Sequence, residues 1–255
     1  MRELLAAARA AQTAVGKMGA SGDAKLDEEV YKETRREREH ESYMRGPFTK
    51  EQFDAMLGPL WVPARRFGLR QGGKVRPIDD FSEFGHNLTV RSRYRVDLGG
   101  IDEVAAVARA FLMAVRTGGT AHIDDDERNA HVAPVHSDWK PSQTVKGFCA
   151  DMQAAFRQVP RLPAHDAFGV VGVFNPKTQA CEFYILDALA FGQGAAVYGF
   201  NRVSRAVDAC LSSLGFMQSN YVDDYPFIVP SGMEGETRTS LIAAMGLFGL
   251  EAQET

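Results

Sequence analysis

Two adjacent aspartates, Asp223 and Asp224, lie between two hydrophobic segments, and this arrangement restricts what the region can fold into. The stretch 215–230 reads GFMQSNYVDDYPFIVP, with strand-forming residues on both sides of the acid pair. This pattern predicts a β-hairpin with the acids at its tip. Two carboxylates about 4 Å apart repel by roughly 4 kcal/mol at an effective dielectric of about 20. The hairpin therefore either leaves both acids in water, the ordinary interpretation of an Asp-Asp pair taken alone, or holds a cation.

A third carboxylate follows another predicted strand. Residues 145–152 (VKGFCADM) form a hydrophobic run that ends at Asp151. After it, the pattern predicts a strand pair at 170–174 and 181–186, a helix from Gly192 to about residue 214, the acidic hairpin, and a helix at 237–250. The hydrophobic faces indicate an α+β fold in which helices cover one face of an antiparallel sheet. If Asp151 and Asp223 end neighbouring strands, three carboxylates meet at one sheet edge.

The charge of the chain is unevenly distributed. A net charge of −4 excludes a globally basic nucleic-acid binder. Between residues 61 and 95, however, eight Arg and Lys residues stand against three acids. Within this stretch, WVPARRFGLR, QGGK and VRPIDDF predict a basic hairpin at 60–81, which would attract an anion or form a plain surface patch. The basic residues are Arg65, Arg66, Arg70, Lys74, Arg76, Arg91, Arg93 and Arg95.

The remaining segments indicate ordinary structure. Residues 1–20 are Ala-rich and predict a helix, which explains the N-terminus as well as a transit peptide does. The densely charged stretch 23–45 predicts a solvated helical arm, and Thr49 is placed to cap a short helix at 47–57. Hydrophobic spacing predicts a helix at 101–115. Residues 117–142 contain three histidines, but their spacing matches no metal-binding template, so we expect a surface loop.

Cysteine content and hydropathy bear on the compartment. Cys149, Cys181 and Cys210 have neither paired nor metal-binding spacing and lie among apolar residues. We interpret them as reduced core residues of an intracellular protein, cytoplasmic or nuclear. No stretch approaches the roughly 20 apolar residues that cross a bilayer, so no membrane partner is expected.

Four segments, in order, resemble motifs of reverse transcriptases. DMQAAFRQVP (151–160), LAFGQGAAVYGFNR (189–202) and YVDD (221–224) resemble the three core palm motifs, and GKVRPIDDFSEFGHN (73–87) is similar to the fingers motif. The matched region covers roughly residues 60–250. Four ordered motifs are far more specific than YVDD alone. The resemblance implies a charged helical arm at 1–46, a fingers-like region at 47–146 and a palm with a ferredoxin-like antiparallel sheet at 147–255.

The resemblance also implies roles for the acids. Asp151, Asp223 and Asp224 match the catalytic aspartates that hold two Mg²⁺ ions, with Mn²⁺ as an alternative, and the main-chain carbonyl of Met152 is expected to join them. Tyr221 and Val222 complete the motif. Two ions about 3.5–4 Å apart would activate the primer 3′-hydroxyl and neutralise the leaving pyrophosphate. Carboxylates, phosphate oxygens and water are the ligands that Mg²⁺ prefers.

Other matched positions imply contacts with the incoming nucleotide. Phe156 matches the aromatic steric gate that excludes a 2′-hydroxyl, although an aromatic residue here is otherwise a core residue. Gly192 and Gln193 match the loop that opens the motif-B helix, where glycine permits close backbone approach. Lys74 and Arg76 match residues that grip the triphosphate; a solvated basic face is the alternative.

The chain departs from the family pattern in several places. Ala190 replaces the usual Pro, the start of the motif-B helix lacks the usual Lys, and residues 117–142 form an insert. The sequence stops after the helix that follows YVDD, so we expect a fingers and palm portion truncated before the thumb. Such a portion would belong to a larger retroelement polyprotein, whose other segments would be partners, or to a truncated genomic copy.

The function implied is RNA-directed DNA synthesis by addition of deoxynucleotides from their triphosphates to a primer on an RNA or DNA template. Three alternatives remain open. The chain could be a catalytically inactive retroelement remnant that only binds nucleic acid through its basic hairpin. It could be another two-metal enzyme on a similar palm, such as a cyclase, although a cyclase needs neither Phe156 nor the fingers motif. Viral RNA-dependent polymerases share the palm, but the aromatic gate favours deoxynucleotides.

Overall fold

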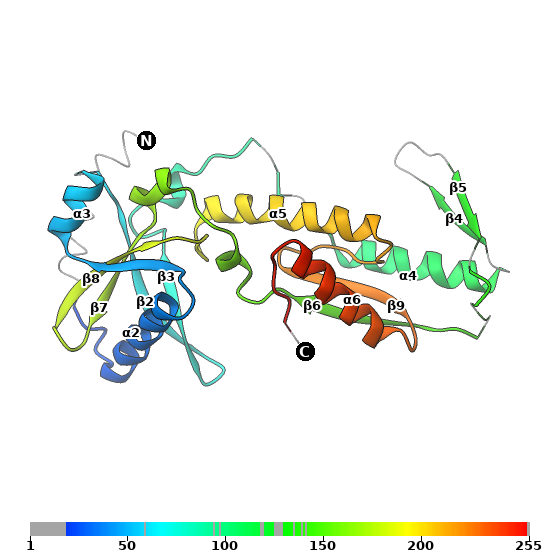
Figure 1. Cartoon of the computed structure of the whole chain (residues 1–255), viewed down its shortest axis with the longest axis horizontal. Coiled ribbons are helices and arrows are strands. Elements are labelled where there is room, and N and C mark those ends of the chain that lie inside the picture. The colour runs from blue at the N-terminus through cyan, green and yellow to red at the C-terminus, as the bar shows by residue number, and fades with distance from the viewer. Residues whose placement is uncertain are drawn as a thin grey trace. The chain divides into compact units, whose positions relative to one another are not determined.

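A computed structural model of the chain describes residues 19–253 except 59, 94, 97, 118–119, 125–129, 135, 139 and 141. The helix expected at 1–20 therefore falls almost entirely outside the described residues. The chain forms two compact units, the first from Met1–Arg95 and Phe156–Phe200 and the second from Val96–Ala155 and Asn201–Thr255. Figure 1 labels their helices and strands. These units cut across the regions expected at 1–46, 47–146 and 147–255.

The first unit contains a five-stranded sheet in the order β1-β8-β7-β2-β3. Strand β2 pairs in parallel with β7, and all other pairs are antiparallel. The α+β class is therefore confirmed, with a mixed sheet in place of the antiparallel one expected. The hairpin at 170–186 forms as predicted, but it pairs with strands from earlier in the chain rather than with 145–151. Its strand β7 is almost completely buried, which requires neighbours on both edges and cover on both faces. The strands are β1 (Met44–Phe48), β2 (Pro63–Gln71), β3 (Lys74–Asp80), β7 (Val170–Asn175) and β8 (Ala180–Leu186).

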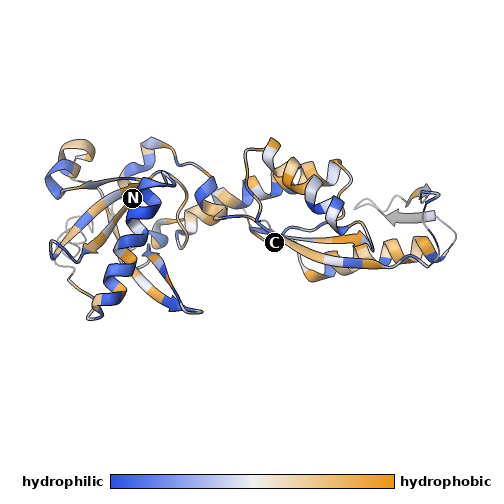
Figure 2. Ribbon diagram, turned by 60° about the horizontal axis from the view of Figure 1, so that its bottom comes forward, coloured by the Kyte–Doolittle hydropathy of each residue, from blue (hydrophilic) through white to orange (hydrophobic). Residues whose placement is uncertain are grey.

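Helix α2 (Ala24–Glu39) is part of the core of the first unit. Val30, Tyr31, Thr34 and Glu37 are buried along one side of it. The expectation of a solvated arm was therefore wrong. Figure 2 shows why the sequence misleads, because most of the helix is hydrophilic and only a narrow stripe is apolar. A narrow stripe is enough to bury a helix when a sheet covers it.

A second cluster of the first unit is aromatic. Trp61 and Phe53, the latter on α3 (Lys50–Leu57), have ring centroids 4.9 Å apart, and Trp61 meets Phe183 edge-on at 5.2 Å. All three side chains are buried. Thr49 caps α3 in a reciprocal capping box with Gln52, as predicted.

The basic hairpin is confirmed. Strands β2 and β3 pair from Arg65 opposite Asp80 to Gln71 opposite Lys74. The two residues of the turn, Gly72 and Gly73, have φ angles of +59° and +77°. Positive φ at both positions is the mirror-image turn that matches the twist of a hairpin, and glycine adopts it without strain.

The second unit is built on the antiparallel pair β6 (Val145–Asp151) and β9 (Asp224–Pro230). Both strands are largely hydrophobic (Figure 2), and helix α6 (Glu234–Leu247) lies over them (Figure 1). The rings of Phe148 and Phe227 stack at 5.0 Å, and the guanidinium of Arg238 on α6 lies 4.3 Å from the centre of the Phe148 ring. Helix α4 (Ile101–Arg116) also packs against β9. Helix α5 (Gly194–Ser213) begins in the first unit and continues in the second.

Two further expectations need correction. The segment 117–142 is not simply a loop, because β4 (Thr120–Asp124) and β5 (Ala130–Pro134) form an antiparallel pair within it. The cysteines are free, as expected, but Cys149 and Cys210 are exposed and only Cys181 is partly buried. Along β6, the apolar neighbours of Cys149, Phe148 and Ala150, point to the opposite face of the strand. Three short 3₁₀ helices complete the described elements: η1 (Asn87–Thr89), η2 (Ala155–Gln158) and η3 (Pro163–Phe168).

No helix within the described residues has the length and hydrophobicity needed to cross a membrane.

Candidate active site

Strand pairing brings Asp151 and Asp224 together. Asp151 is the last residue of β6 and lies directly opposite Asp224, the first residue of β9. Residues directly opposite in an antiparallel pair share a face, with their Cβ atoms about 4.5–5.5 Å apart. The thiol of Cys149, two residues before Asp151, lies on this face as well, with its Sγ 3.7 Å from Asp224 Oδ1.

A tight hairpin turn places Asp223 beside them. The main-chain N–H of Tyr221 donates to the carbonyl of Asp224 at 2.9 Å, and the N–H of Asp224 donates to the carbonyl of Tyr221 at 3.0 Å. Val222 and Asp223 are the two residues of the turn, and Val222 has a φ of +58°. Further bonds join residue 219 to 226 and residue 228 to 217. The predicted hairpin with acids at its tip is therefore confirmed, although its first arm is held by single bridges rather than a continuous strand.

The carboxylates influence one another. Burial raises the pKa of Asp151, and the negative charges of Asp223 and Asp224 raise it further. Burial likewise raises the pKa of Asp223, and Asp224 adds to the effect. A raised carboxyl pKa means that the ionised form is disfavoured at this place. A divalent cation would reverse that preference, because it supplies opposite charge to all three groups.

The backbone of Met152 is turned toward the same place. Met152 lies beside Ala252 on one side, where the adjacent bonds run from Gln253 N–H to the Asp151 carbonyl and from Gln153 N–H to the Glu251 carbonyl. In an antiparallel ladder the N–H and C=O of the intervening residue point to the other side. The N–H of Met152 accordingly donates to the Asp223 carbonyl at 3.3 Å. Its carbonyl faces that side too, as a ligand beside Asp223 requires.

The donor atoms of these residues suit a divalent ion, and the register of β6 with β9 brings the residues together. Three carboxylates and a main-chain carbonyl are hard oxygen donors of the kind that Mg²⁺ and Mn²⁺ bind. Among the described residues, however, no group of three or more His, Cys, Asp and Glu side chains is already gathered as a metal cage. Like charges without an ion between them turn apart. A bound ion would draw the carboxylates of Asp151, Asp223 and Asp224 around it by rotation about their side-chain bonds.

The expected nucleotide contacts belong to the first unit, whereas the acids belong to the second. Phe156 is buried, stacked on Phe200 with ring centroids 4.7 Å apart and edge-on to Phe191 at 5.5 Å. Core packing is sufficient to explain this position. Gln193 lies at the start of α5, where its carbonyl accepts from the N–H of Ala196 at 2.9 Å.

Gly192 occupies a position that suits glycine alone. Its φ is +89°, and a Cβ there would stand 3.0 Å from the carbonyl oxygen of Asp79. The Asn87 side chain holds the loop, because its Nδ2 donates to the Gly192 carbonyl at 3.0 Å and its Oδ1 accepts from the Gly194 N–H at 2.8 Å. The side-chain amide of Asn87 thus links the fingers-like motif to the start of the motif-B-like helix. Asn87 lies within the fingers-like motif 73–87, but no local pattern in the sequence indicates this contact.

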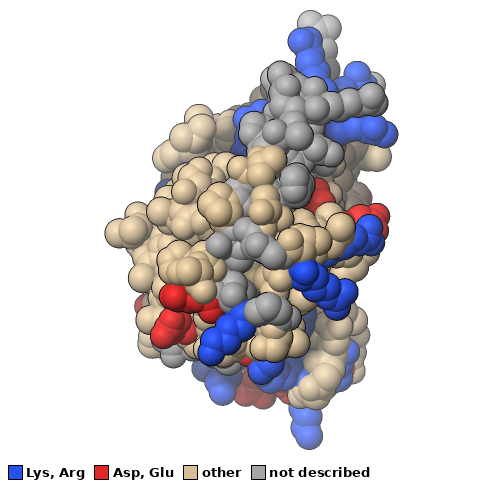
Figure 3. All heavy atoms as spheres, turned by 90° about the vertical axis from the view of Figure 1, so that its right-hand side faces the viewer, with Lys and Arg blue, Asp and Glu red and all other residues tan. Residues whose placement is uncertain are grey.

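Lys74 and Arg76 are exposed on the basic hairpin, whereas several of its other cationic side chains form ion pairs with acids. Arg65 pairs with Glu83 at 2.7 Å, and Arg70 pairs with Asp23 at 3.0 Å. The local excess of positive charge is therefore smaller than the sequence suggests. Figure 3 draws the right-hand side of Figure 1, where β4 and β5 are labelled and the basic hairpin is not, and on that face the Lys and Arg side chains of described residues are scattered among uncharged ones.

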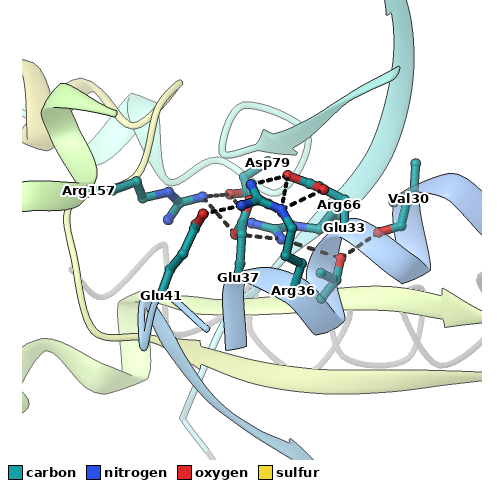
Figure 4. A network of polar contacts seen from close by, with 9 residues as sticks. Val30, Glu33, Arg36, Glu37, Glu41, Arg66, Asp79 and Arg157 are labelled. Atoms are coloured by element: carbon teal, nitrogen blue, oxygen red, sulfur yellow. Dashed lines mark hydrogen bonds and ion pairs between the residues drawn. The ribbon is translucent and has the colours of Figure 1, made fainter. Parts of the chain in front are cut away.

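Arg66 was counted among these surface cations, but it is buried. Its guanidinium donates to both carboxylate oxygens of Asp79, at 2.7 and 3.0 Å, and to Glu37 at 3.0 Å (Figure 4). Arg157, next to Phe156, also reaches Asp79 at 3.2 Å. Burial alone would raise the pKa of Asp79, but the charges of Arg66 and Arg157 hold it below its usual value. This network joins α2, β2, β3 and the segment after Asp151. No local sequence signal marks it.

The chain was also compared with known proteins. It matches no protein-family model, and a search of curated proteins finds no match.

Proposed function

We propose that the chain carries a reverse-transcriptase-like catalytic centre that adds deoxynucleotides to a primer 3′-hydroxyl. The observation that carries this proposal is the placement of Asp151 directly opposite Asp224, with Asp223 in the adjoining turn. The resemblance of the motifs assigns metal-binding roles to these three residues. The strand register supports that assignment independently, because the resemblance rests on the order of residues along the chain and not on which strands pair.

The surroundings of the acids support a polymerase palm. Along β9, Tyr225 and Phe227 alternate with Asp224 and point to the other face. Ser204 of α5 hydrogen-bonds to Tyr225 on that face, and Arg238 of α6 covers Phe148 there. Both helices therefore contact the face away from the acids. We infer a palm-like layer whose acidic face receives the primer end.

The roles of the chain's own groups follow from their chemistry. Asp151, Asp223, Asp224 and the Met152 carbonyl would hold the divalent ions. When bound there, such ions supply charge that acidifies the primer hydroxyl and stabilises the leaving pyrophosphate. Lys74 and Arg76 would bind triphosphate oxygens, as their exposed positions allow, and Arg76 offers the fork geometry that suits phosphate. Asn87 would keep the Gly192 loop in shape for the template and base.

Primer extension tests the proposal. The assay uses the chain with an RNA template, a DNA primer, labelled deoxynucleoside triphosphates and Mg²⁺. We expect incorporation by the wild type and by Asp138→Asn, a control at an aspartate whose side chain is 88% exposed. We expect Asp223→Asn to lower the rate by at least about 10²-fold, because mutating even an outer-shell partner of a metal ligand costs about 10- to 100-fold. Equal rates for Asp223→Asn and the wild type would show that the assignment of the metal site is wrong.

A second candidate is a remnant that binds nucleic acid without catalysis. The observation that favours it is the intact β2–β3 hairpin with exposed Lys74 and Arg76. Phosphate contacts make such binding fall with rising salt. Salt-dependent binding that Lys74→Ala and Arg76→Ala weaken, together with no incorporation by the wild type, would favour this candidate.

A further inference from the structure

The acidic turn contains a strained residue. Val222, immediately before Asp223, has a φ of +58°. A β-branched side chain is rarely found in this left-handed region, and such a residue costs free energy that the surroundings must offset. Glycine or asparagine would occupy the position at lower cost. Something outside the turn must therefore hold Val222 in place.

Ser204, in the middle of α5, contacts this residue directly. Its side chain is fully buried, and its hydroxyl donates a hydrogen bond to the main-chain carbonyl of Val222. The carbonyl of a residue in the turn is thus fixed from a neighbouring helix. Both residues belong to the second unit, as do the three acids.

Two more side chains extend this contact into a buried polar cluster. Asn220 is buried, and its Nδ2 donates to Ser204 Oγ at 2.6 Å and to the Val222 carbonyl at 3.2 Å. The Tyr225 hydroxyl lies 2.8 Å from Ser204 Oγ and 3.2 Å from the Ser204 carbonyl. Ser204 gives its one hydroxyl proton to Val222, so the single proton of the Tyr225 hydroxyl is shared between Ser204 Oγ and the Ser204 carbonyl.

The cluster surrounds the two acids along the chain. Asn220 and Val222 precede Asp223, and Tyr225 follows Asp224. Buried hydroxyl and amide groups are costly unless they are hydrogen-bonded, whereas apolar side chains of similar size would fill the same space more cheaply. The cluster has a role that offsets this free-energy cost if its hydrogen bonds fix the conformation of the acidic turn, which apolar packing would leave variable.

We propose that Ser204, supported by Asn220 and Tyr225, is a positioning residue that holds Val222 in its left-handed conformation and thereby sets Asp223 and Asp224 for divalent-ion binding. This inference rests on the proposed function, because it assigns a role at the same site. Ser204 touches neither ion nor substrate in this account. It acts through the Val222 carbonyl.

The experiment uses the chain with Mn²⁺ as the probe. Ser204→Ala removes the donor to Val222, and Tyr225→Phe removes the supporting hydroxyl. Ser213→Ala is a matched control, because Ser213 lies on the same helix and donates to the Ala209 carbonyl at 2.8 Å from an exposed position. Free Mn²⁺ is measured by electron paramagnetic resonance, and exchange of the Asp224 amide, which bonds within the turn, is measured by NMR.

We expect Ser204→Ala to weaken Mn²⁺ binding roughly five- to tenfold, about the effect of one lost hydrogen bond, and to speed exchange of the Asp224 amide. Tyr225→Phe should act in the same direction but less strongly, and Ser213→Ala should change neither. In a Val222→Gly background the effect of Ser204→Ala should shrink, because glycine needs no support at positive φ. If Ser204 served only to stabilise the fold, Ser204→Ala would lower the melting temperature, and its effect on Mn²⁺ binding would be the same with Val or Gly at position 222.

The outcomes separate this inference from the proposed function. Wild-type affinity for Mn²⁺ and unchanged Asp224 exchange in Ser204→Ala would overturn the inference while leaving the ion site intact. Equal Mn²⁺ binding by the wild type and Asp223→Asn would contradict the proposed function and, with it, the assigned purpose of the cluster. A loss of affinity in Ser204→Ala that Val222→Gly suppresses would support the inference.

Discussion

Asp151 at the end of β6 lies directly across from Asp224 at the start of β9. The residues are far apart in the sequence, and only the antiparallel register makes them neighbours on one face. The adjoining turn adds Asp223, and burial together with mutual repulsion raises the pKa of both Asp151 and Asp223. The site therefore carries an excess of negative charge, which a bound divalent ion would neutralise.

Mg²⁺ should stabilise the chain through these acids. An ion at about 100 times its Kd stabilises the folded state by about 2.7 kcal/mol. For a chain of this size each kcal/mol corresponds to roughly 2–4 °C in melting temperature. We expect a rise of several degrees for the wild type and for Asp138→Asn, and little or none for Asp223→Asn. Calorimetry with and without MgCl₂ measures it, and an equal rise in Asp223→Asn would count against the site.

Removing a charge from the acid turn should also stabilise the ion-free chain. The folded-state pKa of Asp223 is raised, so the folded chain binds its proton more readily than the unfolded chain does. The ionised carboxyl therefore destabilises the folded chain. This loss of stability appears as the pH rises from the ordinary pKa of 3.8 through the raised folded-state pKa. In chelator at neutral pH, Asp223→Asn should melt above the wild type. A lower melting temperature would show that the carboxylate is satisfied without an ion.

Asp79 should be far more important for stability than an exposed acid. The Arg66 side chain is 0% exposed and that of Asp79 is 2% exposed. Asp79→Asn leaves Arg66 buried with a weaker partner, and breaking a buried pair costs about 3–5 kcal/mol. Glu29→Gln, which removes an exposed pair with Arg70, should cost less than about 1 kcal/mol. Urea unfolding compares the two variants, and similar losses would mean that the buried Arg66–Asp79 pair contributes no more to stability than an exposed pair does.

His86 should make stability depend on pH. Burial lowers its pKa, although its Nε2 bonds to the Val62 carbonyl at 3.0 Å. Below the ordinary value of 6.5 the unfolded chain takes up a proton that the folded chain resists, so stability falls as the pH drops. The slope from this group is at most about 1.4 kcal/mol per pH unit. Urea unfolding between pH 7.5 and 5 should show a smaller slope for His86→Gln, and an unchanged slope would exclude His86 as its source.

Gly192→Ala should destabilise the loop before α5. The positive φ and the nearby Asp79 carbonyl both oppose a side chain there, at a cost of about 1–3 kcal/mol. Gly235→Ala on α6 is the matched control, since a Cβ there meets open space and alanine favours a helix. We expect Gly192→Ala to lower the free energy of unfolding and Gly235→Ala to leave it unchanged or raise it. Equal effects would show that the Gly192 conformation is not required.

Local patterns predicted much of this fold and the acidic turn. A hydrophobic run predicted β6 with Asp151 at its end, and glycines predicted the β2–β3 turn, because these features depend on neighbours in the sequence. The pairing of β2 with β7 was not predicted, because nothing local records which distant strand completes a sheet. Arg66 looked like a surface cation for the same reason: its partners, Glu37 and Asp79, become neighbours only in the folded chain.

The most direct test of the central claim is a Mn²⁺ titration followed by electron paramagnetic resonance, with Asp151→Asn as the variant. Asp151 lies on a different strand from the acid pair, so its effect reports on whether the three residues act as one site. We expect Asp151→Asn to bind Mn²⁺ at least roughly tenfold more weakly than the wild type, since loss of a ligand or its support commonly costs 10- to 100-fold in metal affinity, while Asp138→Asn binds as the wild type does. Wild-type affinity in Asp151→Asn would contradict the claim that β6 and the acidic turn together form an ion-binding site.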